Sequence, residues 1–594
     1  MHNFRRNMGG MLMTPALKRL RNSRKKIAQF RTKTGNASKK ESPYIPVFVT
    51  KTPACQGECP SGTNIRGVLT TIANTERDGR TYHDSFRQAF EIIAANNPFP
   101  AVCGRVCPHP CESGCNRQYK DGSLAINNVE RFIGDYALRN GFALPAEPAG
   151  RREEKIAVVG SGPAGLSAAY QLARRGYAVT VFEAFARPGG MLRYGIPDYR
   201  LPQDVLDSEI DRIRSLGVDI RCNVAVGRDI LLDDLRREYA AVFLGIGAHA
   251  GRSLGLPGED AANFFTVTHF LNRINSGCTV NVGNKVLVVG GGDAAIDAAR
   301  ICRRLGADVT MVYRRTRNEM PAIESEIVEA EEEGVKFRFL AAPVELLRAG
   351  DMITGMRCQS MRLGRPDASG RRRPEPVEND FTELAATAVI AAIGQVPCMQ
   401  GFESVDSGRG WIRADSTGIT VEDGVYSGGD ALGLSLVTTS IYQGRIAAAA
   451  IDARLRGVRL PVEEKTVIAN RFSIYYDHYA ASSRNEPASL PLAERMADLQ
   501  REVVATLDES RIVEECARCM SCGLCFDCGN CWNVCGENVM PLKGRLKGDS
   551  AGLATSDCKG CRHCMDECPC GFIEMIDPAT GKYIRASMDN SYLV

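Results

Sequence analysis

The stretch KIAVVGSGPAGLSAAYQLARRGYAVTVFEA, Lys155–Ala184, decides the fold of this chain. It opens on an apolar run, Ile156–Val159, which predicts a buried parallel strand. Gly160, Gly162 and Gly165 follow in G-x-G-x-x-G spacing. After them come an amphipathic segment that predicts a helix and a second apolar run that predicts another strand. This order of strand, glycine-rich turn, helix and strand is typical of a dinucleotide-binding fold.

The three glycines, with Pro163 and Ala164 among them, place a helix N-terminus where it can meet a pyrophosphate. One glycine makes the tight turn, one lets the backbone approach the phosphates, and one lets helix and strand pack closely. Free N–H groups and the helix dipole favour negative charge there. Glu183, at the end of the second strand, is placed to accept hydrogen bonds from a ribose.

The length and charge of the chain limit what it can be. Its 594 residues indicate several domains, each long enough to bury a core. The formal net charge is only +4, so the chain has no overall basic footprint for nucleic acid. No apolar run approaches the roughly 20 residues that span a bilayer. We therefore expect neither a nucleic-acid partner nor a transmembrane segment.

The 23 cysteines gather in two groups. Six lie between Cys55 and Cys115, and twelve lie between Cys516 and Cys570. The other five are isolated, and we expect them to be ordinary core or surface residues: Cys222, Cys278, Cys302, Cys358 and Cys398. Dense C-x-x-C runs beside a nucleotide fold indicate metal ligation in a reducing compartment rather than disulfides. We therefore expect a cytoplasmic protein.

Residues 1–44 form a basic tail, with twelve Lys or Arg and no acid among the first 40. No secretory apolar region follows Arg5 and Arg6, so we expect no signal peptide. Leu12–Phe30 could form a basic amphipathic helix. Two interpretations stay open: a solvated tail, or a segment that docks onto an acidic partner or an anionic surface.

The first group of cysteines is too regularly spaced for core residues. Cys55 and Cys59 open it and precede a helical stretch. Four more follow at intervals of four residues: Cys103, Cys107, Cys111 and Cys115. Soft thiolates without accompanying His ligands favour iron–sulfur clusters, with zinc as the alternative.

The order of these motifs resembles that of a known family. C-x-x-x-C-P starts at Cys55, V-C-G-R-V-C-P at Val102 and N-N-V-E-R-F at Asn127, and the dinucleotide fingerprint comes next. The small subunit of glutamate synthase and the electron-input part of dihydropyrimidine dehydrogenase are similar. The resemblance implies a small helical domain that holds iron–sulfur clusters beside FAD. It also implies the ligands of one cluster, which are Cys59, Cys107, Cys111 and Glu130.

The chain departs from this family at one point. The family has a C-x-x-C before the position of Cys55, whereas no cysteine precedes Cys55 here. Cys55 and Cys115, the remaining candidate ligands, would then lack two partners. We therefore predict one N-terminal [4Fe–4S] cluster rather than two. Cys103 is the ligand least expected from the resemblance.

A glycine-rich loop follows the first fingerprint at Pro188–Pro197, PGGMLRYGIP. It resembles the loop that runs along the flavin in this family. Gly189 and Gly190 permit a close backbone approach to a ligand. The resemblance makes Gly190, Met191 and Arg193 candidate cofactor-binding residues.

A later stretch, Val425–Ala431, has the sequence VYSGGDA and resembles the second flavin motif of the family. The resemblance implies that Gly429 and Asp430 contact the cofactor, with Asp430 facing the ribityl chain and the phosphates. A helix is predicted over Thr438–Arg454, and its N-terminus would then lie near the flavin.

A second fingerprint, KVLVVGGGDAA, stands at Lys285–Ala295, where an apolar strand leads into a glycine turn. Its candidate nucleotide-binding residues are Gly290, Gly291, Gly292, Asp293 and Ala294. Two dinucleotide folds in one chain predict two nucleotides, a flavin and a nicotinamide. A duplicate fold that binds no nucleotide is the alternative.

The residue that stands 23 positions after the first glycine indicates which nicotinamide binds. Glu183 stands 23 residues after Gly160. Tyr313 stands 23 residues after Gly290, and Arg314 and Arg315 follow it. An acid there favours the free 2′-hydroxyl of NAD, and arginines accommodate the 2′-phosphate of NADP. We therefore predict NADPH, with NADH as the alternative.

The end of the chain carries two cysteine runs with the ferredoxin spacing C-x-x-C-x-x-C-x-x-x-C. In a two-cluster bacterial ferredoxin the fourth cysteine of each run serves the other cluster. One predicted [4Fe–4S] cluster has the ligands Cys525, Cys528, Cys531 and Cys568. The other has the ligands Cys558, Cys561, Cys564 and Cys535. Gly536 departs from the pattern, which normally has proline there.

Four cysteines remain outside these sets: Cys516, Cys519, Cys522 and Cys570. They could bind a further metal, but we expect spare thiols near the clusters. Together with the N-terminal cluster, the sequence predicts three [4Fe–4S] clusters, or about twelve iron atoms.

The predicted fold class is α/β, with two Rossmann-like dinucleotide-binding domains and the NAD(P) domain inserted in the FAD domain. A helical iron–sulfur domain precedes them and a ferredoxin-like domain follows. The predicted boundaries are 45–150 for the helical domain, 151–275 and 385–456 for the FAD domain, 276–384 for the NAD(P) domain, 457–510 for a linker and 511–594 for the ferredoxin-like domain. Val389–Gly394 is expected as a buried strand of the FAD domain, and Leu490–Leu507 as a helical connector.

These parts predict an FAD- and iron–sulfur-dependent NAD(P)H oxidoreductase that serves a partner redox protein. The sequence shows no Ser-His-Asp set, carboxylate pair or substrate pocket. We therefore predict no catalytic residue and assign the chemistry to the cofactors. The added ferredoxin module resembles a stand-alone branch of the family, and within it the flavoprotein linked to dissimilatory sulfite reductase.

Other interpretations stay open. The chain could be a ferredoxin–NAD(P) oxidoreductase or a glutamate synthase component, with ferredoxin or a glutaminase-bearing subunit as its partner. It could instead be a non-enzymatic electron-transfer subunit of a larger complex. A homodimer, with the ferredoxin-like module across its two-fold axis, is a further alternative.

Overall fold

The computed structural model describes residues 42–147, 150–368, 370–460, 466–537, 539–540, 553 and 555–584. The helix considered for Leu12–Phe30 lies outside the described residues. Within these ranges, no helix is both long and apolar enough to cross a bilayer.

The first fingerprint lies in a five-stranded parallel sheet. In spatial order its strands are β17 (Val425–Ser427), β6 (Ala241–Leu244), β3 (Lys155–Val159), β4 (Ala178–Phe182) and β5 (Asp219–Arg221). The central strand β3 is buried except for its first residue, as a strand covered on both faces requires. The predicted order of strand, turn, helix and strand is confirmed.

Helix α8 (Pro163–Ala173) follows β3, and α15 (Val437–Leu455) packs along it. The helix predicted over 438–454 is therefore confirmed. Gly444 permits the close crossing, because a Cβ at this position would lie 2.2 Å from the carbonyl oxygen of Ala164. The other helices of this domain are α9 (Met191–Tyr194), α10 (Gln203–Arg214) and α11 (Leu232–Glu238).

The second fingerprint lies in a second five-stranded parallel sheet. Its strands are β11 (Lys336–Phe339), β10 (Asp308–Tyr313), β9 (Lys285–Val289), β15 (Ala388–Ala391) and β8 (Phe264–Thr266). Three helices accompany it: α12 (Val267–Asn275), α13 (Asp293–Arg304) and α14 (Glu324–Glu332). The insertion of one nucleotide-binding domain into another is as predicted.

The boundaries of the inserted domain differ from the prediction of 276–384. Strand β15, which falls in the predicted strand Val389–Gly394, pairs with β9 and β8 rather than with the first sheet. The chain crosses between the domains at β7 (Ala250–Gly251) and β16 (Gln395–Val396), which pair with each other. The predicted boundary at 385 was wrong because a short buried apolar run fits either sheet equally well.

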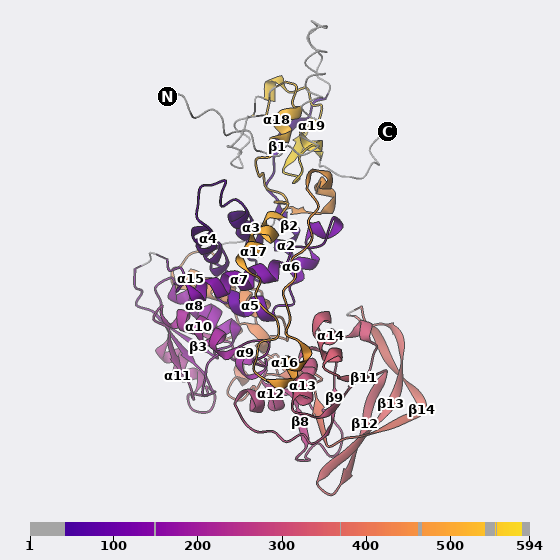
Figure 1. Ribbon diagram of the computed structural model, residues 1–594. Coiled ribbons are helices and arrows are strands. Elements are labelled where there is room, and N and C mark those ends of the chain that lie inside the picture. The colour runs from indigo at the N-terminus through magenta and orange to yellow at the C-terminus, as the bar shows by residue number, and fades with distance from the viewer. Residues whose placement is uncertain are drawn as a thin grey trace.

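Three long antiparallel strands extend the inserted domain. They are β12 (Ala341–Ala349), β13 (Met352–Pro366) and β14 (Arg372–Ala385), paired in that order. No motif in the sequence predicted this meander. In Figure 1 it reaches to the lower right, away from the helical part of the molecule.

The cysteine-rich N-terminal part is helical, as expected. Its helices are α2 (Ala54–Gly57), α3 (Ile65–Ala73), α4 (Tyr82–Ala94), α5 (Pro100–Val106), α6 (Pro110–Ser113) and α7 (Ile126–Arg139). Phe86, Phe90 and Phe132 are buried among them and form part of one core with α8 and α15. The helical domain is therefore packed directly on the first nucleotide-binding domain.

The first strand that the structure describes pairs with a strand near the opposite end of the chain. β1 (Ile45–Phe48) pairs antiparallel with β19 (Ile573–Ile576), which pairs with β20 (Tyr583–Ile584). The buried ion pair between Lys51 and Glu574, at 2.8 Å, adds to this contact. The predicted start of the helical domain at 45 was therefore wrong, because this short strand completes the sheet of the C-terminal module.

The predicted linker, 457–510, is packed against several domains where the structure describes it. β18 (Ile468–Ala469) pairs with β2 (Thr52–Pro53), and Val503 donates from its backbone N–H to the Tyr199 carbonyl at 3.0 Å. The helix expected over Leu490–Leu507 is confined to α16 (Leu492–Ala497). Apolar spacing alone was misleading here, because these side chains contact different domains.

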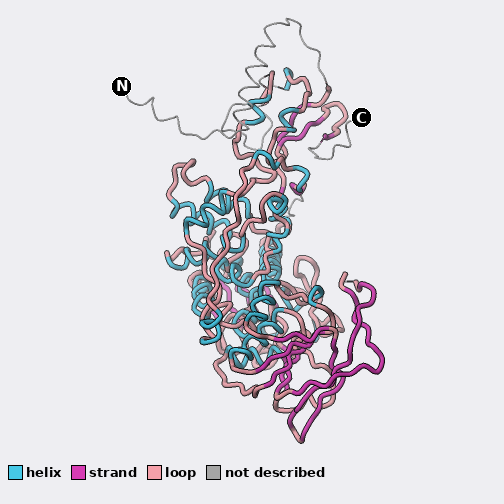
Figure 2. The backbone as a smooth tube through the Cα atoms, turned by 45° about the vertical axis from the view of Figure 1, so that its right-hand side comes forward, coloured by secondary structure: helices cyan, strands magenta, loops and turns pink. Residues whose placement is uncertain are grey.

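The molecule is elongated (Figures 1 and 2). The C-terminal module, with α18 (Asn530–Val534) and α19 (His563–Asp566), stands at one end, and the β12–β14 meander lies at the other. The helical domain and α17 (Glu509–Ala517) lie between them. Figure 2 shows the same division, with helices in the middle and most strands at the lower right.

Candidate functional site

A large cleft opens where the two nucleotide-binding domains meet. The first fingerprint lines it with residues 159–164, and the second lines it with Asp293 and Ala294. Val437 and Ser440, at the N-terminus of α15, complete this side of the wall. Both predicted nucleotide sites therefore face one space.

The glycine turn after β3 has room for a phosphate group at one position only. Gly160 has a φ of +93°, and a Cβ there would lie 2.3 Å from the Gly245 carbonyl oxygen. A Cβ on Gly165 would lie 1.9 Å from the Gly160 oxygen, so this glycine packs helix on strand. At Gly162 nothing lies within 4 Å of an added Cβ, and α8 begins next without a side-chain cap. This space and the uncapped N–H groups fit the pyrophosphate of FAD.

Glu183 follows β4 and is only 4% exposed, in the wall of the cleft. Its Oε2 accepts hydrogen bonds from the Ser161 backbone N–H at 3.0 Å and from the Ser161 hydroxyl. Its Oε1 accepts from the Phe185 N–H at 2.8 Å. These bonds hold the carboxylate beside the glycine turn, where the ribose of a dinucleotide would lie.

The loop Pro188–Pro197 lies against the glycine turn. Gly190 has a φ of +55°, and a Cβ there would lie 2.7 Å from the Gly162 Cα. Gly190 and Met191 both line the cleft. The loop therefore closes over the position where the pyrophosphate fits.

Arg193, the third candidate of this loop, is not among the residues that line the cleft. Its side chain is buried, donates from Nη1 to Gln203 Oε1 at 2.5 Å and forms an ion pair with Asp207. It joins the loop to α10. The prediction that Arg193 contacts the cofactor is not supported by this position.

The second flavin motif reaches the cleft from the other side. Gly429 has a φ of +76° and donates from its N–H to Gln443 Oε1 at 2.7 Å. Asp430 accepts from the Ser435 N–H at 3.0 Å, and burial raises the pKa of its carboxyl. Both residues line the cleft just before α15, opposite the first fingerprint.

The turn between β9 and α13 repeats the geometry of the first turn. It is formed by Gly290, Gly291 and Gly292. A Cβ on Gly290 would lie 2.3 Å from the Ala392 carbonyl oxygen, whereas the nearest atom to a Cβ on Gly292 is 3.8 Å away. α13 begins at Asp293 without a side-chain cap. These features fit the phosphates of a second nucleotide.

The two arginines expected at the 2′-phosphate have different surroundings. Arg314 is exposed where β10 ends. Arg315 is buried, pairs with Asp367 at 2.7 Å and donates from Nε to the Arg372 carbonyl at 2.8 Å. Arg315 therefore connects β10 to the meander, and Arg314 is the one available to a ligand.

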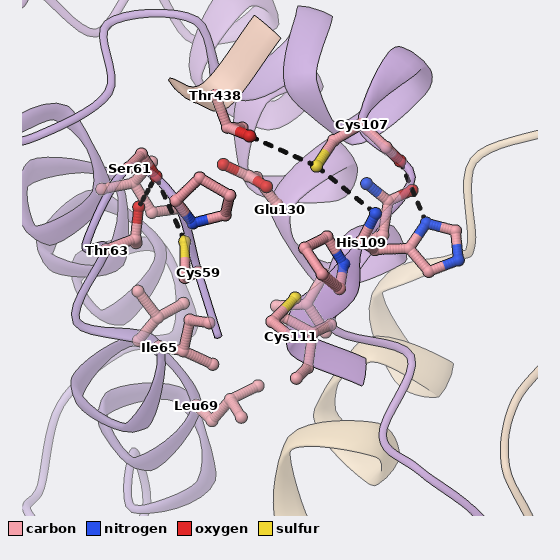
Figure 3. Close-up of a pocket in the computed structure, with 17 residues that line it drawn as sticks. Cys59, Ser61, Thr63, Ile65, Leu69, Cys107, His109, Cys111, Glu130 and Thr438 are labelled. Carbon is pink, nitrogen blue, oxygen red and sulfur yellow. Dashed lines mark hydrogen bonds between the residues drawn. The ribbon is translucent and has the colours of Figure 1, made fainter. Parts of the chain in front are cut away.

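A second, smaller cavity lies inside the helical domain (Figure 3). Three thiols and one carboxylate line it: Cys59, Cys107, Cys111 and Glu130. Cys59 follows α2, Cys107 ends α5, Cys111 lies in α6 and Glu130 in α7. Figure 3 shows the four side chains around a common space, with Ile65 and Leu69 along its edge. The ligand set implied by the resemblance is therefore brought together.

Small donors approach the sulfurs of this cavity. The His109 backbone N–H donates to Cys107 Sγ at 3.4 Å, and the Thr438 hydroxyl lies 4.0 Å from the same sulfur. The Ser61 hydroxyl lies 3.2 Å from Cys59 Sγ. Such donors stabilise negative charge on cluster ligands and tune their reduction potential.

The side chains that line this cavity are costly to ionise unless a cation is bound nearby. Burial raises the pKa of Cys107 to about 12, and the Glu130 carboxylate adds to this rise. Burial raises the pKa of Glu130 to about 7, while Asn97, which donates to it at 2.9 Å, opposes the shift. Of the described residues, no Lys or Arg lines the cavity. A bound metal centre would stabilise all four ligands as anions.

Three thiols and one carboxylate around one cavity are a donor set that an iron–sulfur cluster could use. Within the described ranges, no three His, Cys, Asp or Glu side chains are placed to hold one bare metal ion. Zinc also binds thiolate and carboxylate ligands, so metal analysis decides between a cluster and a zinc ion.

The other N-terminal cysteines lie elsewhere. Cys103 is fully buried in the helical core, with its sulfur 3.8 Å from Asn97 Oδ1. Cys55 and Cys115 do not line the Glu130 cavity and belong to a separate one. Cys103 was the least expected ligand, and its position agrees.

The C-terminal cysteines form two sets. The first is Cys525, Cys528, Cys531 and Cys568. The second is Cys535, Cys558, Cys561 and Cys564. Burial raises the pKa of Cys531 to about 12, and the neighbouring sulfurs of the first set raise it further. Burial also raises the pKa of Cys564, with the other three sulfurs of its set adding to the rise. Each run thus contributes its fourth cysteine to the other set, which is the predicted exchange.

Two protein families match successive parts of the chain. Dihydropyrimidine dehydrogenase domain II, 4Fe-4S cluster, matches residues 47–142. Pyridine nucleotide-disulphide oxidoreductase matches residues 154–444. The first match contains the whole Glu130 cavity apart from Thr438, and the second contains both fingerprints. Neither match reaches the C-terminal cysteines.

Individual proteins match over longer ranges. The NADP(+)-dependent formate dehydrogenase subunit beta of Moorella thermoacetica is 40% identical over 80% of this chain and 70% of its own length. The glutamate synthase [NADPH] small chain of Azospirillum brasilense is 36% identical over 68% of this chain and 86% of its own length. The NADPH-Fe(3+) oxidoreductase subunit beta of Geobacter sulfurreducens is 42% identical over 59% of this chain, which spans only 52% of that relative.

The two sheets and the matching families confirm the predicted fold class and the prediction of an oxidoreductase. The Moorella and Azospirillum relatives, which this chain covers over 70% and 86% of their own length, are more than 30% identical to it. The chain therefore belongs to the family of iron–sulfur flavoprotein oxidoreductases that includes the small chain of glutamate synthase.

Proposed function

We propose that this chain is an NADPH:acceptor oxidoreductase with FAD in its cleft and a partner redox protein as its acceptor. One observation carries the proposal: the cleft and the Glu130 cavity share a wall. Val106 and Pro108 line the cleft, while Cys107, between them, lines the cavity. Only a few atoms of this backbone would separate a flavin from a cluster ligand.

The residues of the cleft would position the cofactors rather than react themselves. The α8 N-terminus would hold the FAD pyrophosphate, and Glu183 would orient its ribose. Bound FAD would supply the exchange between the two-electron chemistry of a nicotinamide and the one-electron chemistry of clusters. Exposed Arg314 supports NADPH as the nicotinamide, and all three relatives above are named for NADP or NADPH.

The two C-terminal cysteine sets would each bind a [4Fe–4S] cluster and form the outlet to the partner. Their spacing and their exchanged fourth cysteines support this assignment. Two of these cysteines, Cys528 and Cys561, are exposed, so a partner could approach closely. Thiolate-ligated clusters of this kind fit a reducing compartment such as the cytoplasm.

The partner is proposed from chemistry and resemblance. Dissimilatory sulfite reductase is the first candidate, because the added ferredoxin-like module resembles the flavoprotein linked to that enzyme. A formate dehydrogenase catalytic subunit is the second, because the Moorella relative aligns with 80% of this chain. In either case the acceptor would be a redox protein that takes electrons one at a time.

Steady-state kinetics under anaerobic conditions test this function. The purified chain should oxidise NADPH with a viologen dye, and Cys111→Ser should retain reduction of the flavin by NADPH while it loses reduction of a protein acceptor. Exposed Cys278 lies outside the cysteine sets, so Cys278→Ser is the control and should keep both activities. Failure of the wild-type chain to oxidise NADPH with any acceptor would favour a non-enzymatic subunit instead.

A further inference from the structure

A third cavity lies between the helical domain and the C-terminal part of the chain. Four cysteines line it: Cys55, Cys115, Cys519 and Cys522. Cys55 lies in α2, and Cys115 directly precedes the short helix η1 (Asn116–Tyr119). The other two follow α17 in C-x-x-C spacing. Three stretches that are far apart in sequence therefore bring four thiols to one space.

The four sulfurs are close neighbours in a buried environment. Burial raises the pKa of Cys55 well above its usual value, and the other three sulfurs each raise it further. Burial raises the pKa of Cys519 to about 11 and that of Cys522 to about 12, and Cys115 adds to both. A metal centre would bind all four as thiolates and offset their mutual repulsion.

Two arginines line the same cavity and attach the C-x-x-C segment to the helical domain. Arg66, from α3, donates from Nη1 to the Cys522 carbonyl oxygen at 2.6 Å. Arg117, from η1, donates from Nη1 to the Arg518 carbonyl oxygen at 2.5 Å. A four-iron core with four thiolates is an anion, and two nearby guanidinium groups stabilise it.

The remaining wall suits a cluster ligand sphere. Asn116 donates from Nδ2 to Cys522 Sγ at 3.5 Å, which is the kind of contact that orients a ligand and tunes its potential. Apolar side chains close much of the rest: Pro53, Leu69, Leu124 and Ile126. Such a lining keeps water from the sulfurs.

The third cavity lies between the other predicted cluster sites. Leu69 and Ile126 line both this cavity and the Glu130 cavity, so the two are back to back. On the other side, Gly523 donates from its N–H to the Cys570 carbonyl at 2.6 Å, and Cys570 Sγ lies 3.9 Å from Cys568 Sγ. In Figure 1, α2 and α17 accordingly lie between α5 and the α18–α19 end.

We propose that Cys55, Cys115, Cys519 and Cys522 bind a further [4Fe–4S] cluster. The C-x-x-C after α17 supplies the two partners that Cys55 and Cys115 lack on their N-terminal side, and the predicted number of clusters rises from three to four. The role of this cluster rests on the proposed function. It takes one electron from the cluster at the Glu130 cavity and passes one to the ferredoxin-like module, with NADPH as the source and the partner protein as the sink.

Zinc is the other metal that four thiolates bind. The four thiols line one cavity, and thiolates of this kind suit either a cluster or a zinc ion. A zinc ion is therefore an outcome that the test must be able to report.

Metal content of the full-length chain, purified anaerobically, gives the first test. Iron, acid-labile sulfide, zinc and FAD are measured on the same sample. Four clusters predict about sixteen irons and sixteen sulfides per FAD. About twelve irons would overturn the proposal, as would about one equivalent of tightly bound zinc.

Variants on the two sides of the cavity give the second test. Cys519→Ser combined with Cys522→Ser should lose about four irons and one spin system from the electron paramagnetic resonance spectrum of the dithionite-reduced protein. Cys55→Ser, on the opposite wall, should lose the same spin system. Cys516 is buried in α17 and does not line the cavity, so Cys516→Ser is the matched control and should keep all the iron.

An unchanged iron count in the double variant would overturn the proposal. If the double variant fails to fold, the iron content of the wild-type protein and of the Cys55→Ser variant decides. Reduction of the flavin by NADPH should persist in all the folded variants, because both fingerprints lie outside this cavity. A chain that binds about sixteen irons but never oxidises NADPH would contradict the proposed function and leave the cluster assignment standing.

Discussion

Glu209 is a fully buried carboxylate that supports Cys107, the proposed cluster ligand at the end of α5. Its oxygens accept hydrogen bonds from the first N–H groups of this helix, those of Ala101 at 2.9 Å and Val102 at 3.0 Å. It therefore anchors the helix that Cys107 ends. Burial raises the pKa of Glu209 to about 7, although the nearby Arg212 lowers it.

This raised pKa predicts a pH-dependent stability that Glu209→Gln removes. The folded protein holds the proton more tightly than the unfolded chain does. The stability from this group is therefore complete below the unfolded pKa and is lost as the pH rises through about 7. Thermal unfolding at about pH 5 and about pH 8 measures the effect. Relative to wild type, the Gln variant should gain stability at the higher pH, and an equal difference at both values would contradict the assignment.

Arg314 and Arg315 allow a paired test of nicotinamide recognition. Arg314→Ala should weaken NADPH binding by on the order of 1.5–3 kcal/mol, because one charge-assisted contact to the 2′-phosphate is lost, and leave NADH binding nearly unchanged. Arg315→Ala breaks the pair with Asp367 and should lower the melting temperature with little change in the NADPH to NADH ratio. Titration of both nucleotides with each variant measures this. Equal weakening of both nucleotides by Arg314→Ala would contradict it.

Individual residues could be predicted where their role depends on a local motif. Gly160, Gly162 and Glu183 lie where the fingerprint places them. Arg193 and Arg315 have the right charge at motif positions, yet each is engaged by an acid that only the fold brings near. The motif cannot distinguish a basic side chain that binds phosphate from one that forms a structural ion pair.

Two glycine substitutions in α8 and α15 distinguish an effect on folding stability from an effect on cofactor binding. A Cβ on Gly444 would lie 2.2 Å from the Ala164 carbonyl oxygen, so Gly444→Ala must push the two helices apart. We expect a loss of roughly 1–3 kcal/mol of folding stability, as is usual for overpacking. Chemical unfolding of the FAD-free protein measures this directly.

Gly162→Ala is the matched substitution at the start of α8. No protein atom lies within 4 Å of the added Cβ, so folding stability should be unchanged. The methyl group enters the space assigned to the FAD pyrophosphate, so the purified protein should contain much less flavin. If Gly162→Ala destabilises the FAD-free fold, or if it retains its full flavin content, then this space is not the pyrophosphate site.

Whether a segment is a helix or a strand was easier to predict from the sequence than which elements it pairs with. β3, α8 and α15 follow from apolar periodicity and glycine punctuation. β15 is a strand as expected, but it belongs to the other sheet, because pairing is decided by crossover connections far along the chain. β1 is only four residues long and pairs with β19 at the other end of the chain, which no local pattern indicates.

Across the whole molecule, the C-terminal part is built into the N-terminal half. Glu515 of α17 accepts a hydrogen bond from the Ala125 N–H at 2.8 Å, and Ile512 is fully buried in the core of the helical domain. Cysteine spacing predicted two separate iron–sulfur regions. It could not show that Cys519 and Cys522 line the same cavity as Cys55 and Cys115. Deletion of residues 511–594 would therefore damage the helical domain, so point substitutions test the outlet more cleanly.

We propose the two C-terminal cysteine sets as the outlet for electrons. Cys528→Ser combined with Cys561→Ser removes one exposed ligand from each set. Anaerobic stopped-flow spectroscopy then compares reduction of the flavin by NADPH, reduction of a small dye, and reduction of the protein partner, with Cys278→Ser as the control. We predict that the double variant reduces its flavin and the dye at wild-type rates and no longer reduces the partner. Retained reduction of the partner, or a parallel loss of all three, would contradict it.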